Sequence, residues 1–226
     1  MTDGTLPDPS TTTRTRIRRI PENSVPKRAA LHHVLDAGLV AHVAVIDDER
    51  QPYVVPVAYA RRGDEVVFHG STGSRLFREL ALGQPTCLTV TLLDGLVLAR
   101  SAFESSMNYR SAMVIGTARR LSRDDELDAL RTITEHLLPG RWADCRHPSA
   151  KERAATMTLA LALDECSVKI RTGGPDDAPE DVIDPVWSRV WAGTVPIHES
   201  YGAPVRSDEC LAEVEVPHYV QSWRRS

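Results

Sequence analysis

The chain has 226 residues, of which 42% are hydrophobic and 26% are charged. This composition is typical of a globular protein and excludes disorder over most of the chain. The formal net charge of −4 argues against a general nucleic-acid-binding protein. No apolar run approaches the roughly 20 residues that a membrane-spanning helix needs, and the polar first residues do not resemble a secretory signal. We therefore expect a cytoplasmic protein whose four cysteines are reduced thiols.

The chain divides into three regions by composition. Residues 1–20 are rich in Thr, Pro and Arg, which predicts a segment that is mobile or only loosely docked. Residues 21–172 carry the regular apolar patterns and should form the main domain. In residues 173–226, Pro and Gly recur every few positions, yet three of the four tryptophans lie there. We expect this extension to pack on the main domain or on a partner subunit, because a disordered tail rarely carries so much aromatic surface.

The patterns within residues 21–172 predict short strands and a few helices. Ser24 as N-cap and Gly38 as terminator predict the first helix. Strands are predicted over residues 39–46, 53–60, 65–69, 86–93, 96–102, 113–121 and 166–171. Further helices are predicted over residues 74–82, 122–138 and 149–163. Because the first strands are joined by turns too short for a parallel crossover, we expect a mainly β fold, an antiparallel barrel of about six strands with flanking helices.

The turn Gly70–Arg75, with the sequence GSTGSR, carries the most chemical information. Gly70 and Gly73 can bring backbone N–H groups close to a ligand, and Arg75 can grip two phosphate oxygens. The turn also supplies three hydroxyl groups, those of Ser71, Thr72 and Ser74. It matches neither a Walker A loop nor the dinucleotide fingerprint. A plain strand-to-helix loop capped by Ser74 is the alternative, which the turn taken alone favours.

Two other segments fit a flat ligand. In the first, residues 51–59, Pro56 should interrupt the strand ladder and leave neighbouring backbone groups free for the edge of a heterocycle. In the second, residues 108–116, Arg110 and Ser111 precede an apolar run and could line a pocket. The alternatives are an ordinary edge strand and the polar start of a strand.

These three segments, in this order and spacing, resemble the flavin-binding split barrel of the pyridoxamine 5′-phosphate oxidase superfamily. The shared motifs are PYVVPVAY, FHG followed by the small-residue turn, QPTCLTV and YRSAMVIG. Within the superfamily, the chain is most similar to the branch of the nitroimidazole-resistance flavoproteins. The resemblance covers about residues 17–172. It does not include the substrate-gripping C-terminal strand of the oxidase proper, so oxidation of pyridoxamine phosphate is not expected.

The resemblance implies a homodimer with flavin mononucleotide (FMN) at the subunit interface. It places Pro56 and Val57 at the edge of the isoalloxazine ring. It places other residues beside the ring or its phosphate, namely His69, Gly70, Ser71, Thr72, Ser74 and Arg75. A strand start near the cofactor matches Tyr109, Arg110 and Ser111. His69 could also donate a proton to a flavin-bound substrate, although a histidine that only packs against the cofactor is an equally good interpretation.

The implied function is an FMN-dependent oxidoreductase that reduces a nitro compound or another electron-poor small molecule, with NAD(P)H as a candidate donor. The alternatives are a carrier or sensor that binds flavin, deazaflavin or haem without turnover, and a barrel that has lost its cofactor. A metal site is not expected, because a single Cys-x-His pair at Cys145 and His147, with His136 nearby in sequence, falls short of zinc-ligand spacing.

Overall fold

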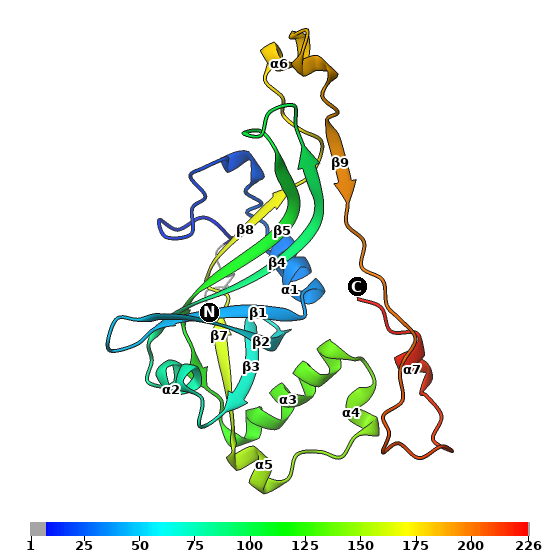
Figure 1. Cartoon of the computed structure of the whole chain (residues 1–226). Coiled ribbons are helices and arrows are strands. Elements are labelled where there is room, and N and C mark those ends of the chain that lie inside the picture. The colour runs from blue at the N-terminus through cyan, green and yellow to red at the C-terminus, as the bar shows by residue number, and fades with distance from the viewer. Residues whose placement is uncertain (1–7, 226) are drawn as a thin grey trace.

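The structure, a computed structural model, describes residues 8–225. Its centre is one antiparallel sheet with the strand order β6-β7-β3-β2-β1-β4-β5-β8, and β9 is added to β4. The strands are β1 (Val40–Ile46), β2 (Pro52–Arg62), β3 (Glu65–Ser71), β4 (Pro85–Leu98), β5 (Ser106–Thr117), β6 (Arg119–Arg120), β7 (Thr156–Ala162), β8 (Glu165–Arg171) and β9 (Gly193–Pro196). The sheet curls into a half-barrel (Figure 1). The expected mainly β split barrel is therefore confirmed.

Helices lie on the flanks of this sheet. The α-helices are α1 (Arg28–Ala37), α2 (Arg75–Ala81), α3 (Arg123–Leu137), α4 (Arg141–Asp144), α5 (Ala150–Ala154), α6 (Pro179–Ile183) and α7 (His218–Gln221). Two 3-10 helices are η1 (Pro21–Asn23) and η2 (Trp187–Arg189). In the described part of the chain, no helix is long and apolar enough to cross a membrane.

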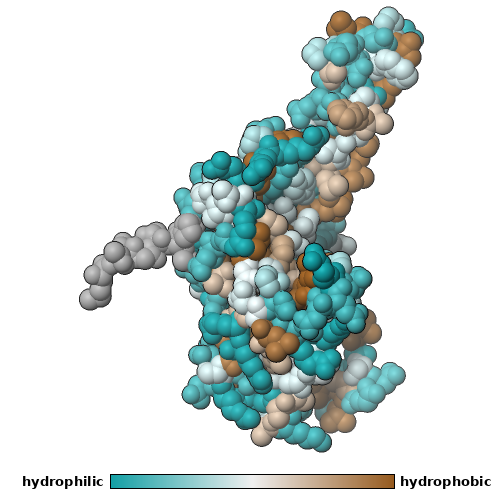
Figure 2. All heavy atoms as spheres, turned by 90° about the vertical axis from the view of Figure 1, so that its left-hand side faces the viewer, coloured by the Kyte–Doolittle hydropathy of each residue, from teal (hydrophilic) through white to brown (hydrophobic). Residues whose placement is uncertain are grey.

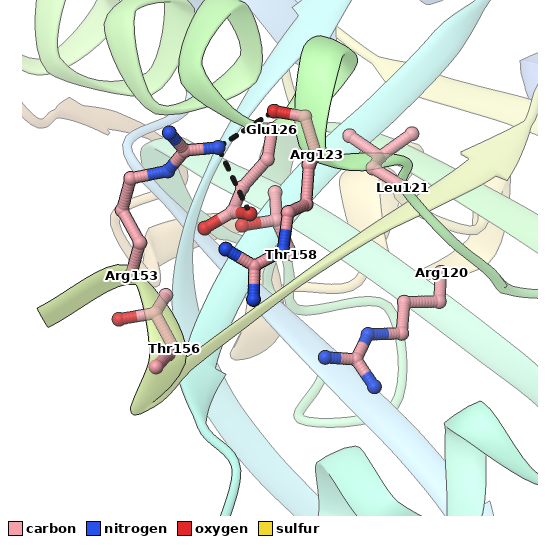
Figure 3. A pocket seen from close by; sticks show the side chains of 8 residues that line it. Arg120, Leu121, Arg123, Glu126, Arg153, Thr156 and Thr158 are labelled. Atoms are coloured by element: carbon pink, nitrogen blue, oxygen red, sulfur yellow. Dashed lines mark hydrogen bonds and ion pairs between the residues drawn. The ribbon is translucent and has the colours of Figure 1, made fainter. Parts of the chain in front are cut away.

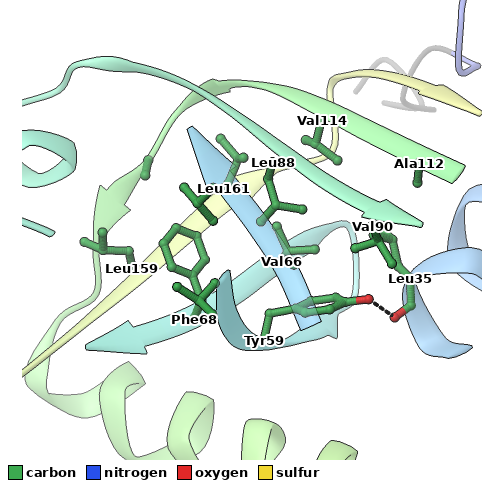
Figure 4. Packing of buried hydrophobic residues seen from close by; sticks show 14 of the residues in the cluster. Leu35, Tyr59, Val66, Phe68, Leu88, Val90, Ala112, Val114, Leu159 and Leu161 are labelled. Atoms are coloured by element: carbon green, nitrogen blue, oxygen red, sulfur yellow. Dashed lines mark hydrogen bonds between the residues drawn. The ribbon is translucent and has the colours of Figure 1, made fainter. Parts of the chain in front are cut away.

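The main core fills the inside of the curled sheet. Leu31, Val34 and Leu35 recur at helical spacing on α1 and are fully buried against it. Tyr59 of β2 and Phe68 of β3, which lie opposite each other on these paired strands, are the largest fully buried side chains among the described residues. The Tyr59 hydroxyl donates a hydrogen bond of 2.6 Å to the carbonyl oxygen of Leu35, as Figure 4 shows. This bond fixes the end of α1 to the sheet.

A second, smaller core lies on the opposite face of the sheet. There Ala129 and Ile133 of α3 pack against Val67 of β3 and Ala160 of β7. Because side chains alternate along a strand, Val66 and Phe68 point into the half-barrel, whereas Val67 and His69 point to the α3 side. This alternation decides which side of the sheet each residue of the predicted site can reach.

The predicted helix over residues 149–163 is wrong. Only α5 is helical there, and β7 follows it at once, paired with β3 over seven residues from Thr156 to Ala162. Met, Leu and Ala dominate this run and are good helix formers, which explains the error. Tertiary contacts override this helix propensity, because β7 is buried between the core of the half-barrel and α3.

Several predicted boundaries also shift. The two strands predicted over residues 86–93 and 96–102 are the single strand β4, which ends at Leu98 and has a bulge between Leu93 and Gly95. The strand β5 begins at Ser106, seven residues before the predicted start at residue 113. Ser24 does not cap α1. It ends η1, and α1 begins at Arg28.

Both terminal regions contact the sheet within the described range. The N–H of Ser10 donates to the carbonyl oxygen of Cys166 at 2.7 Å, so part of the segment expected to be mobile or loosely docked lies against β8. Residues 1–7 of that segment lie outside the described residues. In the extension, β9 pairs with β4 over Leu98–Gly95, and the ring of Tyr219 approaches Gly140.

We expect Tyr59→Phe to lower the free energy of unfolding by about 1–3 kcal/mol, because the buried Leu35 carbonyl would lose its partner. Urea unfolding followed by circular dichroism measures this. Tyr201→Phe is the matched control, since its hydroxyl bonds the exposed Glu199, and we expect a change within about 0.5 kcal/mol. Equal stability of Tyr59→Phe and the wild type would contradict this role for the bond.

Candidate functional site

The strands β2 and β3 separate from one another partway along their length. They pair from Arg62 opposite Glu65 up to Tyr59 opposite Phe68. Beyond that point, residues 52–58 of β2 pair only with β1, and residues 69–71 of β3 pair only with β7 among the described strands. Each strand therefore presents an edge of backbone N–H and C=O groups that no described strand satisfies. Such edges bind another strand or a flat polar ligand.

The predicted break at Pro56 is wrong, because β2 continues through it and Pro56 lies opposite His42 of β1. The proline is tolerated because this part of β2 has a strand on one side only. Val57 is only 9% exposed and belongs to the core. The side chain of Val57 therefore stabilises the half-barrel, and only its backbone is available at the split.

His69 lies at the first position of β3 beyond the split, opposite Thr158 of β7. It is exposed in the single chain, and its imidazole makes no hydrogen bond to a described residue. Nearby atoms still remove water from the ring and lower the pKa of His69. As the pH falls below about 6.5, the unfolded chain takes up this proton first, so stability falls toward acid. The lowered pKa favours the uncharged form of the imidazole.

The turn after β3 uses most of its own donors. The N–H of Gly73 donates to Ser71 Oγ at 3.1 Å, and the N–H of Ser74 donates to the Ser71 carbonyl oxygen at 3.0 Å. Both the N–H and the hydroxyl of Thr72 donate to the carbonyl oxygen of Ala155. The Ser74 hydroxyl makes no capping bond to α2. Of the predicted donors, the Ser74 hydroxyl and the Arg75 guanidinium are therefore the most available to donate hydrogen bonds to a ligand.

Arg75 has an intramolecular partner that the sequence interpretation missed. Its guanidinium forms an ion pair with Asp47 and lies 4.4 Å from the centroid of the Tyr53 ring. Burial acts to raise the pKa of Asp47, but hydrogen bonds from Gln51 and Tyr53 and the charge of Arg75 together lower it. The Arg75 side chain is still 50% exposed, so it retains free donors. The acidic residues in the turn 47–50 are the only feature of the sequence that pointed to a partner for Arg75.

Gly70 has a packing role in addition to the predicted one. A Cβ atom at Gly70 would overlap the ring of Phe77 of α2. Gly70 is therefore needed for packing inside the chain, whether or not its backbone also approaches a ligand. Gly73 is unlike it, because a Cβ atom there would meet only Ser71 Oγ at 3.5 Å.

The third predicted segment lies elsewhere in the single chain. Arg110 forms an ion pair of 2.8 Å with Asp94, and Ser111 Oγ donates to the Lys169 carbonyl oxygen. Tyr109 lies on β5 between Leu93 of β4 and Arg171 of β8, next to the edge strand of the sheet. None of the contacts of these three residues involves residues 69–75, so one described chain does not bring them to the split.

The histidines and cysteine considered for a metal have other contacts. His136 Nε2 lies 2.7 Å from the Gly38 carbonyl oxygen, and His147 stacks on Trp142 with ring centroids 4.6 Å apart. Cys145 donates to the Trp142 carbonyl oxygen. Within residues 8–225, no group of three His, Cys, Asp or Glu is placed to hold a metal ion.

We expect Gly70→Ala to lower the free energy of unfolding by about 1–3 kcal/mol, because the added methyl group forces Phe77 to move. The measurement is thermal unfolding without added ligand. Gly73→Ala is the matched control in the same turn and should change stability by less than about 1 kcal/mol. Equal stability of the two variants would show that Gly70 is not a packing residue.

Comparison with known proteins places this site in context. A family model described as pyridoxamine 5′-phosphate oxidase matches residues 27–170, which is more than half of the chain. Comparison with curated proteins finds no significant match. The FAD and haem-binding protein from Mycobacterium smegmatis is 42% identical with a TM-score of 0.82, over 88% of this chain and 95% of that one.

Two other solved structures are informative. The flavocytochrome Anf3 from Azotobacter vinelandii is 36% identical with a TM-score of 0.88, over 97% of this chain and 100% of that one. A Bacteroides thetaiotaomicron protein named for 5-nitroimidazole antibiotic resistance is 21% identical with a TM-score of 0.55, over 65% of this chain and 86% of that one. The last likeness concerns the fold alone. The family model, the half-barrel and its split strands together show that this chain belongs to the pyridoxamine 5′-phosphate oxidase-like family of flavin-binding split barrels.

Proposed function

We propose that this protein is an oxidoreductase that binds a flavin at the split between β2 and β3 and a haem beside it. The observation that carries the proposal is the separation of the two strands after Tyr59 and Phe68, which leaves two unpaired backbone edges next to a free imidazole. The relatives at 42% and 36% identity, an FAD and haem-binding protein and a flavocytochrome, support the choice of cofactors.

The residues at the split fit a flavin, in a modified form of the arrangement that the sequence predicts. The free edge of residues 52–58 can bond the rim of the ring system, while Ser74 and the exposed part of Arg75 can hold its phosphate. The turn contributes few free N–H groups, because three of them are bonded within the chain. Sequence resemblance alone predicts FMN, whereas the relative named for FAD favours the dinucleotide.

His69 would suit a haem, because its imidazole nitrogen could bind the iron. The ring has no hydrogen bond to a described residue, and the lowered pKa of His69 favours the uncharged form that binds metal. When bound, the two cofactors supply electron transfer to a small electron-poor acceptor, with NADH or NADPH as the donor. The role of this chain is to bind and orient them and to exclude water from the split.

A second candidate function is reduction of a nitro-type compound at the flavin alone. In that case the exposed imidazole of His69 would hydrogen-bond the substrate in place of binding iron. The same free imidazole favours this candidate, and the absorption spectrum of the protein separates the two.

A second copy of the chain should complete the site. On the part of β2 that lacks a second neighbouring strand, the side chain of Val54 is 62% exposed. A second exposed apolar region lies on the projecting arm, which consists of β4, β5, β9, α6 and η2. Its exposed side chains are Trp187 (52%), Trp191 (64%) and Ile183 (81%). Figure 2 shows hydrophobic residues along this arm. Apolar surface of this extent is usually covered by a partner, so we propose a homodimer in which Tyr109, Arg110 and Ser111 of one subunit approach the split of the other.

We expect His69→Ala to lose haem absorption and to keep flavin absorption, because only the imidazole that would bind the iron is removed. The measurement is the visible spectrum of protein purified with hemin and FAD supplied. His147→Ala is the matched control, since that imidazole is stacked on Trp142, and it should keep both absorptions. A wild-type protein that binds neither cofactor, or a His69→Ala variant with an unchanged haem spectrum, would contradict the proposal.

We expect the wild type to sediment at twice the chain mass of 25.0 kDa. Val54→Asp should give a monomer with at least tenfold weaker flavin binding, because a charge would be buried in the interface. Val205→Asp, at a residue 93% exposed in the extension, should remain dimeric. A Val54→Asp protein that is still a dimer with normal flavin affinity would show that this face is not the interface.

A further inference from the structure

A cavity of about 320 Å³ opens beside the first turn of α3, next to the short strand β6 (Figure 3). Its lining contains none of the residues of the two free edges, 52–58 and 69–71. Its polar lining consists of three arginines, one glutamate and two threonines, namely Arg120, Arg123, Arg153, Glu126, Thr156 and Thr158.

The positive charge of this cavity is only partly compensated. Arg153 lies 3.6 Å from the Glu126 carboxylate and donates a hydrogen bond of 2.6 Å to the carbonyl oxygen of Arg123, so its guanidinium is held in place. The side chains of Arg120 and Arg123 form no ion pair or hydrogen bond with a residue of the described chain. Two guanidinium groups at one cavity therefore lack a counter-charge, which favours binding of an anion.

Arg119 and Arg120 show that this arrangement is not general surface charge. Arg119 forms an ion pair of 2.7 Å with Glu65 of β3, which lies beyond β7 in the sheet. Arg120 follows it on β6 and lines the cavity instead. One arginine of the pair is neutralised, and the other is left free at the cavity.

Thr158 gives an independent indication of a ligand. It is only 3% exposed, it lines the cavity, and its hydroxyl has no hydrogen-bond partner in the described chain. A buried hydroxyl without a partner is costly. An anion oxygen in the cavity would accept its hydrogen bond. The N-terminal end of the 15-residue helix α3 also favours negative charge at this position.

The cavity borders the predicted phosphate turn. In the β3–β7 register Thr158 lies opposite His69, and Thr156 lies opposite Ser71. The N–H of Thr72 bonds Ala155, one residue from this lining. A ligand that extends from the split along β7 could therefore reach the arginines.

We propose that this cavity binds a phosphoryl group, held by Arg120, Arg123 and the hydroxyl of Thr158. A phosphate monoester or a diphosphate carries about two negative charges, which matches the two uncompensated guanidinium groups, whereas a single carboxylate carries only one. At about 30 Å³ for each water-sized volume, the cavity also has room for more than the phosphoryl group itself. The source is either the diphosphate of a bound flavin dinucleotide or a separate phosphorylated molecule. The chemistry of recognition is the same for both.

The test is calorimetric titration with inorganic pyrophosphate, on the protein as purified and after removal of flavin. We expect the double variant Arg120→Ala, Arg123→Ala to bind pyrophosphate at least tenfold more weakly than the wild type. Arg131→Ala is the matched control on the same helix, because Arg131 pairs with Asp128 outside the cavity, and its affinity should stay within twofold. No binding to either form of the wild type, or equal binding by the double variant, would overturn the proposal.

Thr158→Val keeps the test decisive if the double variant does not fold. Valine has nearly the same shape, and the lost hydroxyl has no partner in the described chain, so the melting temperature should be unchanged or higher. Pyrophosphate affinity should fall at least threefold. A Thr158→Val protein with unchanged affinity would remove Thr158 from the site and contradict the proposal.

FAD and FMN titrations distinguish the two sources. If the cavity holds the diphosphate of the flavin, the double Arg variant should weaken FAD binding at least tenfold more than FMN binding, and pyrophosphate should compete with FAD. If the ligand is separate, both flavin affinities stay unchanged and pyrophosphate binds the flavin-loaded protein. Pyrophosphate binding to a chain that takes up no flavin would support this site and count against the proposed function.

Discussion

The strand β2 pairs with two strands, β1 and β3, and it pairs with each over only part of its length. Residues 52–58 are fixed by pairing with β1, and residues 59–62 are fixed by pairing with β3. The buried rings of Tyr59 and Phe68, both 0% exposed, lie at the last shared pair and hold the two strands together there. Beyond that pair the strands must separate, so their free edges follow from core packing. The position of His69 and of the following turn depends on this separation.

Much of the fold could be predicted from local pattern. Alternating apolar residues around short turns indicated the first three strands, and the small residues at Gly70–Arg75 marked the turn into α2. The strand β7 could not be predicted, because its run of Met, Leu and Ala suits a helix as well as a doubly buried strand. Only its long-range pairing with β3 decides between them.

The candidate site was predictable only in part. The sequence indicated which segments carry polar groups, but not how the folded chain uses them. The ion pair of Asp47 and Arg75 joins residues 28 positions apart, and the packing of Phe77 under Gly70 depends on the placement of α2. Arg153 likewise lies 30 residues from Arg123 in the sequence, and only the fold brings it to the carbonyl oxygen of Arg123. Contacts of this kind follow from tertiary structure alone.

The proposed function requires that a flavin occupies the split between β2 and β3. Hydrogen–deuterium exchange of the flavin-stripped protein, with and without added FAD, tests this occupancy. Because the free edges carry amides that no described strand protects, we expect slower exchange over residues 54–57 and 69–71 when FAD binds. Protection confined to other parts of the chain, such as the arm of β4 and β5, with no change at the split, would contradict it.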